Sequence, residues 1–118
     1  MNIPSRTVNL PDVEFEKSHV DGRDRGMRVL QHCGPTPATK HLEVGLFELL
    51  PHEEPHAKHT HLEEELLVVT RGRGEIECGE VRREVGPGSV TYVAPHVPHS
   101  IRNTGEETLT FHWIKWRN

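Results

Sequence analysis

Residues 59–72 read HTHLEEELLVVTRG, and they indicate how this chain folds. In Glu65–Thr70 the glutamate is followed by a run of aliphatic and β-branched side chains, and Gly72 and Gly74 mark a turn directly after it. Such a run bounded by glycines predicts a β-strand. Both faces of this strand carry apolar side chains, so we expect both to be covered.

The rest of the chain from residue 41 onward repeats this pattern of short apolar segments between turns. Gly79-Glu80 has the length of a two-residue hairpin turn, and apolar residues nowhere recur at helical spacing over three turns. Several short strands at this spacing predict an antiparallel sandwich or barrel. The further strands that we expect are Leu42–Leu50, Glu75–Cys78, Val81–Val85, Val90–Ala94, His99–Arg102 and Thr108–Trp116.

Residues 1–40 are polar and rich in glycine and proline, which excludes a long helix. A turn is expected at residues 21–24 and a short strand at Met27–Leu30. The segment is either a loosely packed arm or an ordered extension of the sheet. We therefore divide the chain into an N-terminal arm, 1–40, and a barrel, 41–118.

Composition narrows the class of protein. The 118 residues suit one domain, and no stretch approaches the roughly 20 apolar residues of a membrane helix. A net charge of -4 without a basic patch gives no sign of a nucleic-acid partner. The N-terminus lacks an apolar signal core, so we expect a cytoplasmic protein whose Cys33 and Cys78 are free thiols.

The last expected strand also has two apolar faces. Leu109, Phe111 and Trp113 share one face, whereas Ile114 and Trp116 lie on the other. A barrel wall has only one face inside, so the second needs cover from the N-terminal arm or another subunit. We expect a homodimer.

Ten histidines are unusually many for this length. Three of them, together with one glutamate, suggest a metal site. His59 and His61 point the same way on an extended chain. Glu65 follows after a turn, so its carboxylate can face the two imidazoles, and His99 is the expected fourth ligand. Nitrogen and carboxylate donors suit Mn, Fe, Co, Ni, Cu or Zn and leave positions open for substrate.

These segments resemble the two motifs of the cupins, which are small double-stranded β-helix proteins with an antiparallel jelly-roll barrel. The first motif, G-x5-HxH-x3–4-E-x6-G, is matched here by HxH, the acid and Gly72, with Glu53 at its leading glycine. The second, G-x5-PxG-x2-H-x3-N, is matched by Gly88, His99 and Asn103, with Ala94 and His96 at its proline and glycine. The resemblance covers about residues 42–116.

The resemblance implies that His59, His61, Glu65 and His99 hold one divalent transition metal per chain. It implies an enzyme acting on a small polar or anionic metabolite, and this ligand set favours a dioxygenase-type oxidoreductase. A non-redox isomerase or lyase with the same site, and a ligand-binding cupin without turnover, are the alternatives. Folds alone do not decide between them.

A general base is not obvious from the sequence. His96, near the expected cavity mouth, and His112, if its strand face points inward, are the catalytic candidates. Lys58, Arg102 and Lys115 are candidates for holding an anionic substrate. The following residues are expected to be exposed or to serve packing alone: His52, His56, Glu63, Glu64, Arg71, Arg73, Phe47 and Tyr92.

Overall fold

The structure is a computed structural model, and it describes residues 5–7, 9, 16–20, 23–52 and 58–118. Within these ranges the chain forms nine β-strands and no helix, so the predicted all-β fold is confirmed. Nothing in these ranges is a helix that could cross a membrane. The strands are β1 Glu16–Val20, β2 Arg23–Cys33, β3 Leu42–Leu49, β4 Glu64–Arg71, β5 Gly74–Cys78, β6 Val81–Val85, β7 Val90–Val93, β8 His99–Asn103 and β9 Leu109–Trp116.

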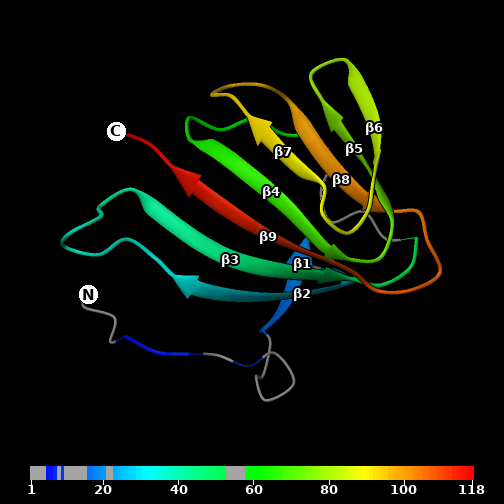
Figure 1. Cartoon of the computed structure of the whole chain (residues 1–118), viewed down its shortest axis with the longest axis horizontal. Helices are drawn as coiled ribbons and strands as arrows, with labels where there is room; N and C mark the ends of the chain where they lie inside the picture. The colour runs from blue at the N-terminus through cyan, green and yellow to red at the C-terminus, as the bar shows by residue number, and fades with distance from the viewer. Residues whose placement is uncertain (1–4, 8, 10–15, 21–22, 53–57) are drawn as a thin grey trace.

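The strands form two antiparallel sheets. The larger has the order β1-β2-β3-β9-β4-β7, and the smaller has the order β6-β5-β8 (Figure 1). The two sheets do not close into a single hydrogen-bonded barrel among the described residues. They face each other across a core to which both contribute, because Leu67 and Phe111 of the large sheet cluster with Ile76 and Ile101 of the small one.

Side-chain alternation places this core on one face of the large sheet. Glu65, Leu67 and Val69 of β4 are buried, whereas their neighbours along the strand are partly exposed. The same inner face of β9 carries Trp113, whose ring lies against Gly45 of β3. A Cβ at that glycine would overlap the indole, so this close approach requires glycine.

Two turns shape the end of the molecule opposite the histidines. Gly72 has φ of 83°, and a Cβ there would meet the Thr108 carbonyl oxygen at 2.5 Å, which explains the glycine of the first motif. Asn103 is buried, donates through Nδ2 to the carbonyls of Leu49 (3.0 Å) and Glu107 (2.8 Å), and accepts from the Gly105 N–H (2.9 Å). It therefore ties the β8–β9 turn to the end of β3.

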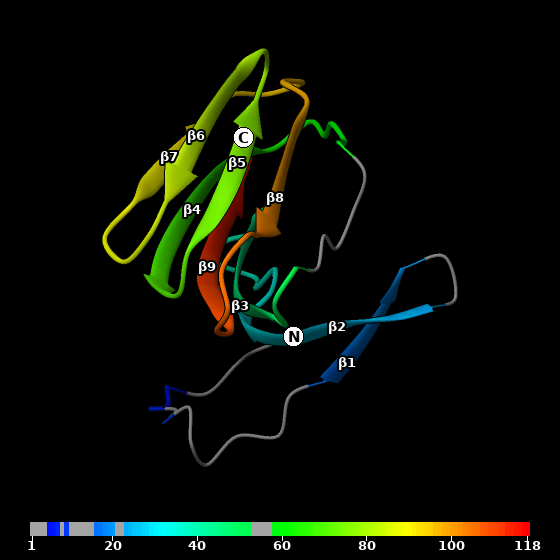
Figure 2. The same cartoon turned by 90° about the vertical axis from the view of Figure 1, so that its right-hand side faces the viewer.

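The N-terminal region contains more strand than the sequence indicated. The expected strand Met27–Leu30 lies within the longer β2, which pairs with β3 from Met27 to Cys33. β1 was not predicted. It pairs antiparallel with β2, and Val20 lies opposite Arg23, so the chain reverses direction within the expected turn at residues 21–24, although Arg23 and Asp24 already belong to β2. Residues 21 and 22 lie outside the described residues. Figure 2 shows β1 and the start of β2 projecting away from the small sheet and from the other strands of the large sheet.

The outer face of the large sheet is apolar, as both expected strand faces indicated. Leu66 of β4 pairs with Ile114 of β9 on one side and with Tyr92 of β7 on the other. Val90 and Tyr92 are 61% and 51% exposed. The expectation that Tyr92 serves packing is wrong, because its ring is exposed and its hydroxyl donates to Glu64 (2.6 Å).

Candidate metal centre

The HxH segment is attached to the small sheet by backbone hydrogen bonds. The His59 N–H donates to the His99 carbonyl (3.0 Å), and the His99 N–H donates to the His59 carbonyl (2.9 Å). The His96 N–H donates to the carbonyl of His61 (2.9 Å). These bonds bring the first histidine pair beside the start of β8, forty residues further along the chain.

Three imidazoles and one carboxylate meet at this junction. One nitrogen of each of His59, His61 and His99 lies within 4.8 Å of the others, so the cluster could hold a metal ion. The Glu65 Oε2 atom lies 2.8 Å from His61 Nε2 and 3.2 Å from His99 Nε2. His99 and Glu65 are buried, whereas the His59 side of the cluster faces solvent.

Backbone carbonyls orient two of the rings. His61 Nδ1 lies 2.9 Å from the Glu63 carbonyl oxygen, and His99 Nδ1 lies 2.9 Å from that of Val97. A carbonyl only accepts, so each Nδ1 carries the proton, and each Nε2 of the neutral ring presents a lone pair. Hydrogen positions are assigned here from these partners.

Both of these lone pairs therefore point at Glu65, whose carboxylate also only accepts. The buried Nε2 of His99 has no hydrogen-bond partner among the described residues. Such a group of acceptors requires a cation between them, either an extra proton on an imidazole or a metal ion. Three nitrogens and one oxygen are suitable donors for first-row divalent metals.

Without a metal, the acid and the imidazole perturb each other. Burial alone would raise the pKa of Glu65, but the close approach of the His99 and His61 imidazoles outweighs burial, so the pKa is lowered. Burial alone would lower the pKa of His99, but the close approach of the Glu65 carboxylate and the hydrogen bond to the Val97 carbonyl raise it. The site therefore favours an ionised Glu65 carboxylate beside a positive charge.

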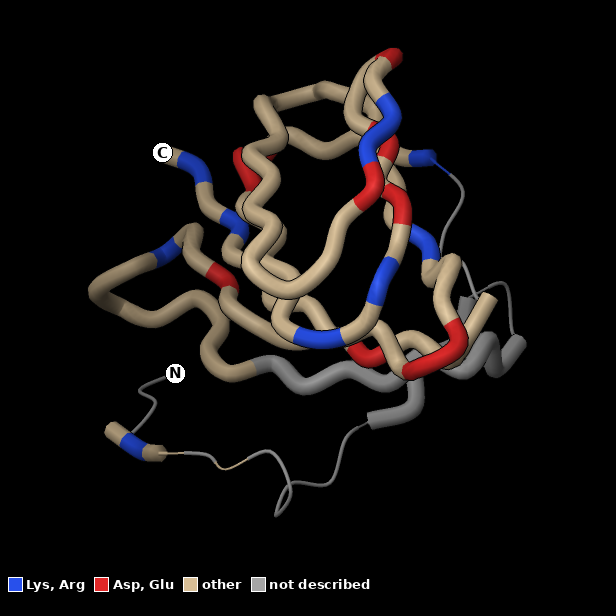
Figure 3. Tube along the Cα trace, turned by 45° about the vertical axis from the view of Figure 1, so that its right-hand side comes forward, with Lys and Arg blue, Asp and Glu red and all other residues tan. Residues whose placement is uncertain are grey.

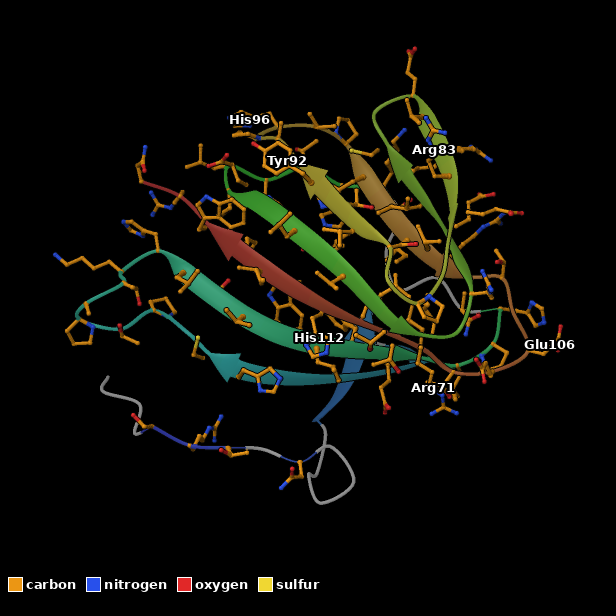
Figure 4. All side chains as sticks on the ribbon, in the orientation of Figure 1. Arg71, Arg83, Tyr92, His96, Glu106 and His112 are labelled. Carbon is orange, nitrogen blue, oxygen red and sulfur yellow. The ribbon has the colours of Figure 1, made fainter. Side chains whose placement is uncertain are left out.

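The two candidates for a general base lie away from one another. His96 is exposed in the loop between β7 and β8, near Tyr92 (Figure 4). His112 pairs with Val68, on the sheet face opposite to Glu65, and stacks on His32 with ring centroids 6.0 Å apart. Its face points outward, so His112 does not line the interior, and burial lowers its pKa.

Two of the three candidate cations lie on the outer face of the small sheet, and the third lies on the large sheet. Lys58 donates to the Gly79 carbonyl and lies 3.1 Å from Glu77. Arg102 lies 3.1 Å from Glu75, on the same outer face of the small sheet. Lys115 alone of the three belongs to the inner face of the large sheet, where it is the register partner of Glu65.

Most of the remaining expectations hold. Phe47 packs on Phe111 and Trp113, with ring centroids 5.4 and 4.7 Å apart, and both cysteines are free. Arg71, Arg73 and His52 are exposed, and His52 lies 3.1 Å from Glu106, which Figure 4 shows at the periphery. Glu64 is partly exposed. Glu63 is not simply solvated, because its Oε2 is buried without a hydrogen-bond partner in the described chain. His56 and Glu53 lie outside the described residues.

Sequence reasoning did not find the groups that hold the ligands in place. The carbonyls of Glu63 and Val97 each lie two residues from the histidine that they orient. Backbone carbonyls leave no residue-type signal in a sequence. The one available signal was the rigid Pro95–Pro98 approach to His99.

Comparison with known proteins agrees with this fold. A family model described as "Cupin domain" matches residues 45–115. No curated protein sequence matches the chain significantly.

Solved structures share the fold across almost the whole chain. A Thermotoga maritima protein named "a predicted oxalate decarboxylase" has a TM-score of 0.82 at 18% identity, with 96% of this chain and 100% of that chain covered. KdgF from Halomonas has a TM-score of 0.76 at 16% identity, covering 98% and 96%. An Acidithiobacillus ferrooxidans protein provisionally named a sugar phosphate isomerase is 31% identical with a TM-score of 0.60, covering 66% of this chain and 51% of that one.

Proposed function

The chain belongs to the cupin family, and on that premise we propose that it is a metal-dependent enzyme acting on a small polar or anionic metabolite. His59, His61, His99 and Glu65 would hold one divalent transition metal. When bound, the metal would supply Lewis-acid polarisation of a substrate oxygen or, if redox-active, electrons for oxygen chemistry. The protein itself fixes the positions of the metal ligands and shields from solvent the side of the site where Glu65 and His99 are buried.

One observation carries this proposal. Two imidazoles whose Nδ1 protons are bound by carbonyls turn their Nε2 lone pairs toward a single carboxylate oxygen, at 2.8 and 3.2 Å. An interior of three nitrogens and an anion without a cation would be costly to desolvate. The arrangement is therefore better suited to a metal than to a purely structural polar interior.

Within this class we favour a dioxygenase-type oxidation, because a carboxylate ligand lowers the charge of the site and suits Mn or Fe. Non-redox isomerase or lyase chemistry is the second candidate. It is supported by the 31% identity to the protein provisionally named a sugar phosphate isomerase. Neither candidate has an assigned general base: His96 remains a prediction, and the outward position of His112 speaks against it.

Metal analysis is the first test. Tag-free protein, purified without chelator or added metal, is expected to contain about one transition metal per chain. His61→Ala should lose it, whereas the control His52→Ala, which alters an exposed histidine, should retain it. Unchanged metal in His61→Ala, or a wild-type protein that takes up none on titration, would contradict the metal site and favour a binding cupin without turnover.

The second test separates the two chemistries. Metal-loaded protein is incubated with panels of small hydroxy acids, keto acids and sugar phosphates, while an oxygen electrode and NMR follow the reaction. Oxygen consumption that requires the metal would support the dioxygenase-type oxidation. Turnover that continues without oxygen would instead support isomerase or lyase chemistry, and binding without turnover would overturn both.

A further inference from the structure

Lys115 links the proposed metal centre to a hollow at the end of the large sheet where β3 begins and β9 ends. On β9 it is the register partner of both Glu65 on β4 and Glu43 on β3. Residues paired in this way share a sheet face, with Cβ atoms about 5 Å apart. Lys115 therefore stands beside a proposed metal ligand, and its positive charge acts on the pKa of His99.

The hollow itself has a volume of about 180 Å³ and is lined mainly by charged side chains. It is smaller than the roughly 300 Å³ at which pockets for drug-sized ligands begin, so it suits one functional group of a metabolite. Figure 3 shows the basic positions at the C-terminal end of the chain near those before β3. The charged and titratable lining residues are Lys40, His41, Lys115, Arg117, Glu43 and Glu63.

The charge of this lining contrasts with that of the whole chain. Three cations face two carboxylates in the hollow, although the net charge of the protein is -4. The Lys115 Nζ lies 3.3 Å from Glu43 Oε2, and both side chains are about one-third exposed, at 28% and 36%. A partly exposed pair of this kind is weak, so another anion can compete for the ammonium.

Glu63 provides a second polar group in the same hollow. Its Oε2 is buried and has no hydrogen-bond partner among the described residues, and its carbonyl holds the His61 ring. A buried acceptor without a donor is costly, and a ligand hydroxyl would satisfy it. The hollow thus offers a cation and an acceptor at the side of the metal centre.

We propose that this hollow is the anion subsite of the enzyme, with Lys115 binding the carboxylate or phosphate of a small hydroxylated metabolite. This assignment rests on the proposed function for the role of the metal, but binding of the anion by the hollow does not require the metal. The other two candidate cations, Lys58 and Arg102, are paired on the outer face of the small sheet.

The test is a titration of ¹⁵N-labelled protein, both as purified and after chelation, followed by NMR. The probes are glycolate, inorganic phosphate and uncharged ethylene glycol. Glycolate or phosphate should shift the amides of residues 40–43, 63 and 115–117 in both forms. Whichever binds more tightly identifies the anionic group, and ethylene glycol should bind far more weakly.

Three variants sharpen the result. Lys115→Met should weaken anion binding about 10- to 100-fold, as expected for loss of a hydrogen bond to a charged group. Glu43→Gln, which removes the competing carboxylate, should strengthen it, and the control Arg102→Met should leave it unchanged. Metal content should stay the same in all three, and Arg117→Met replaces Lys115→Met if the latter does not fold.

The proposal is overturned if neither anion shifts these amides. It is also overturned if Lys115→Met and Arg102→Met weaken binding equally, or if Lys115→Met leaves binding unchanged. If the purified protein contains no metal and takes none up, but still binds anions through Lys115, the proposed metal function alone is contradicted and the anion subsite stands.

Discussion

Removing the metal is expected to destabilise the fold, because the proposed ligands come from both sheets. His99 begins β8 in the small sheet, Glu65 lies in β4 of the large one, and the segment carrying His61 joins them. A ligand present at 100 times its Kd stabilises the folded state by about 2.7 kcal/mol. For 118 residues the unfolding entropy is about 0.25 kcal/mol per kelvin, so Tm should fall by about 11 °C.

The size of this shift should depend on pH. In the metal-free protein, the lowered pKa of Glu65 gives stability that is present above about pH 4.5 and is lost as pH falls through the folded value. The raised pKa of His99 gives stability that is complete below about pH 6.5 and is lost as pH rises through the folded value. The pair therefore stabilises the metal-free fold most between these limits.

Metal binding has the opposite pH dependence, because the ion must displace the His99 proton. Its apparent affinity should rise about tenfold per pH unit until that proton is lost. This rise corresponds to about 1.4 kcal/mol, or about 6 °C in Tm, per pH unit. The difference in Tm between loaded and chelated protein should therefore widen from pH 5.5 to 7.5.

Differential scanning calorimetry on both forms, with metal content measured on each sample, checks this. His99→Ala should abolish the difference, and His52→Ala should preserve it. Equal melting temperatures for verified metal-loaded and metal-free protein at pH 7.5 would refute the reasoning that the ion joins the two sheets.

Three further outcomes are expected. Gly45→Ala should cost about 1–3 kcal/mol of stability by forcing Trp113 off its site, measured by urea unfolding; no loss would mean that the indole moves freely. Asn103→Ala should cost about 2–4 kcal/mol, because it leaves buried carbonyls without donors, whereas a surface control such as Thr104→Ala should be nearly neutral in the same assay. The chain should sediment as a dimer, and Ile114→Glu, on the apolar outer face, should shift it toward monomer; a monomeric wild-type chain would contradict this.

The fold was predictable because most of its strands can be recognised from their own local sequence. The run of aliphatic and β-branched side chains in Glu65–Thr70 and the glycines after it required no tertiary information. β1 was missed because its sequence, EKSHV, has no such run, and among the described strands it pairs only with the neighbouring β2. A strand defined by its partner cannot be found from its own residues.

The site was predictable to the extent that it depends on spacing. The register between β4 and β9, which places Lys115 next to Glu65 and turns His112 outward, is a long-range property that residue types did not reveal. The backbone conformation of His96 was likewise not evident from its residue type. It occupies the glycine position of the second motif with φ of 64°, a conformation that histidine adopts more readily than most non-glycine residues.

The position of the final strand constrains when this protein can fold. β9 follows the other described strands in chain order, yet it lies between β3 and β4 and hydrogen-bonds to both along their length. Until residues 109–116 have been synthesised, β3 and β4 each present an open edge, which invites pairing with other chains. Folding of the large sheet is therefore expected to wait for β9, to be dominated by contacts distant in sequence, and to be slow for a domain of this size.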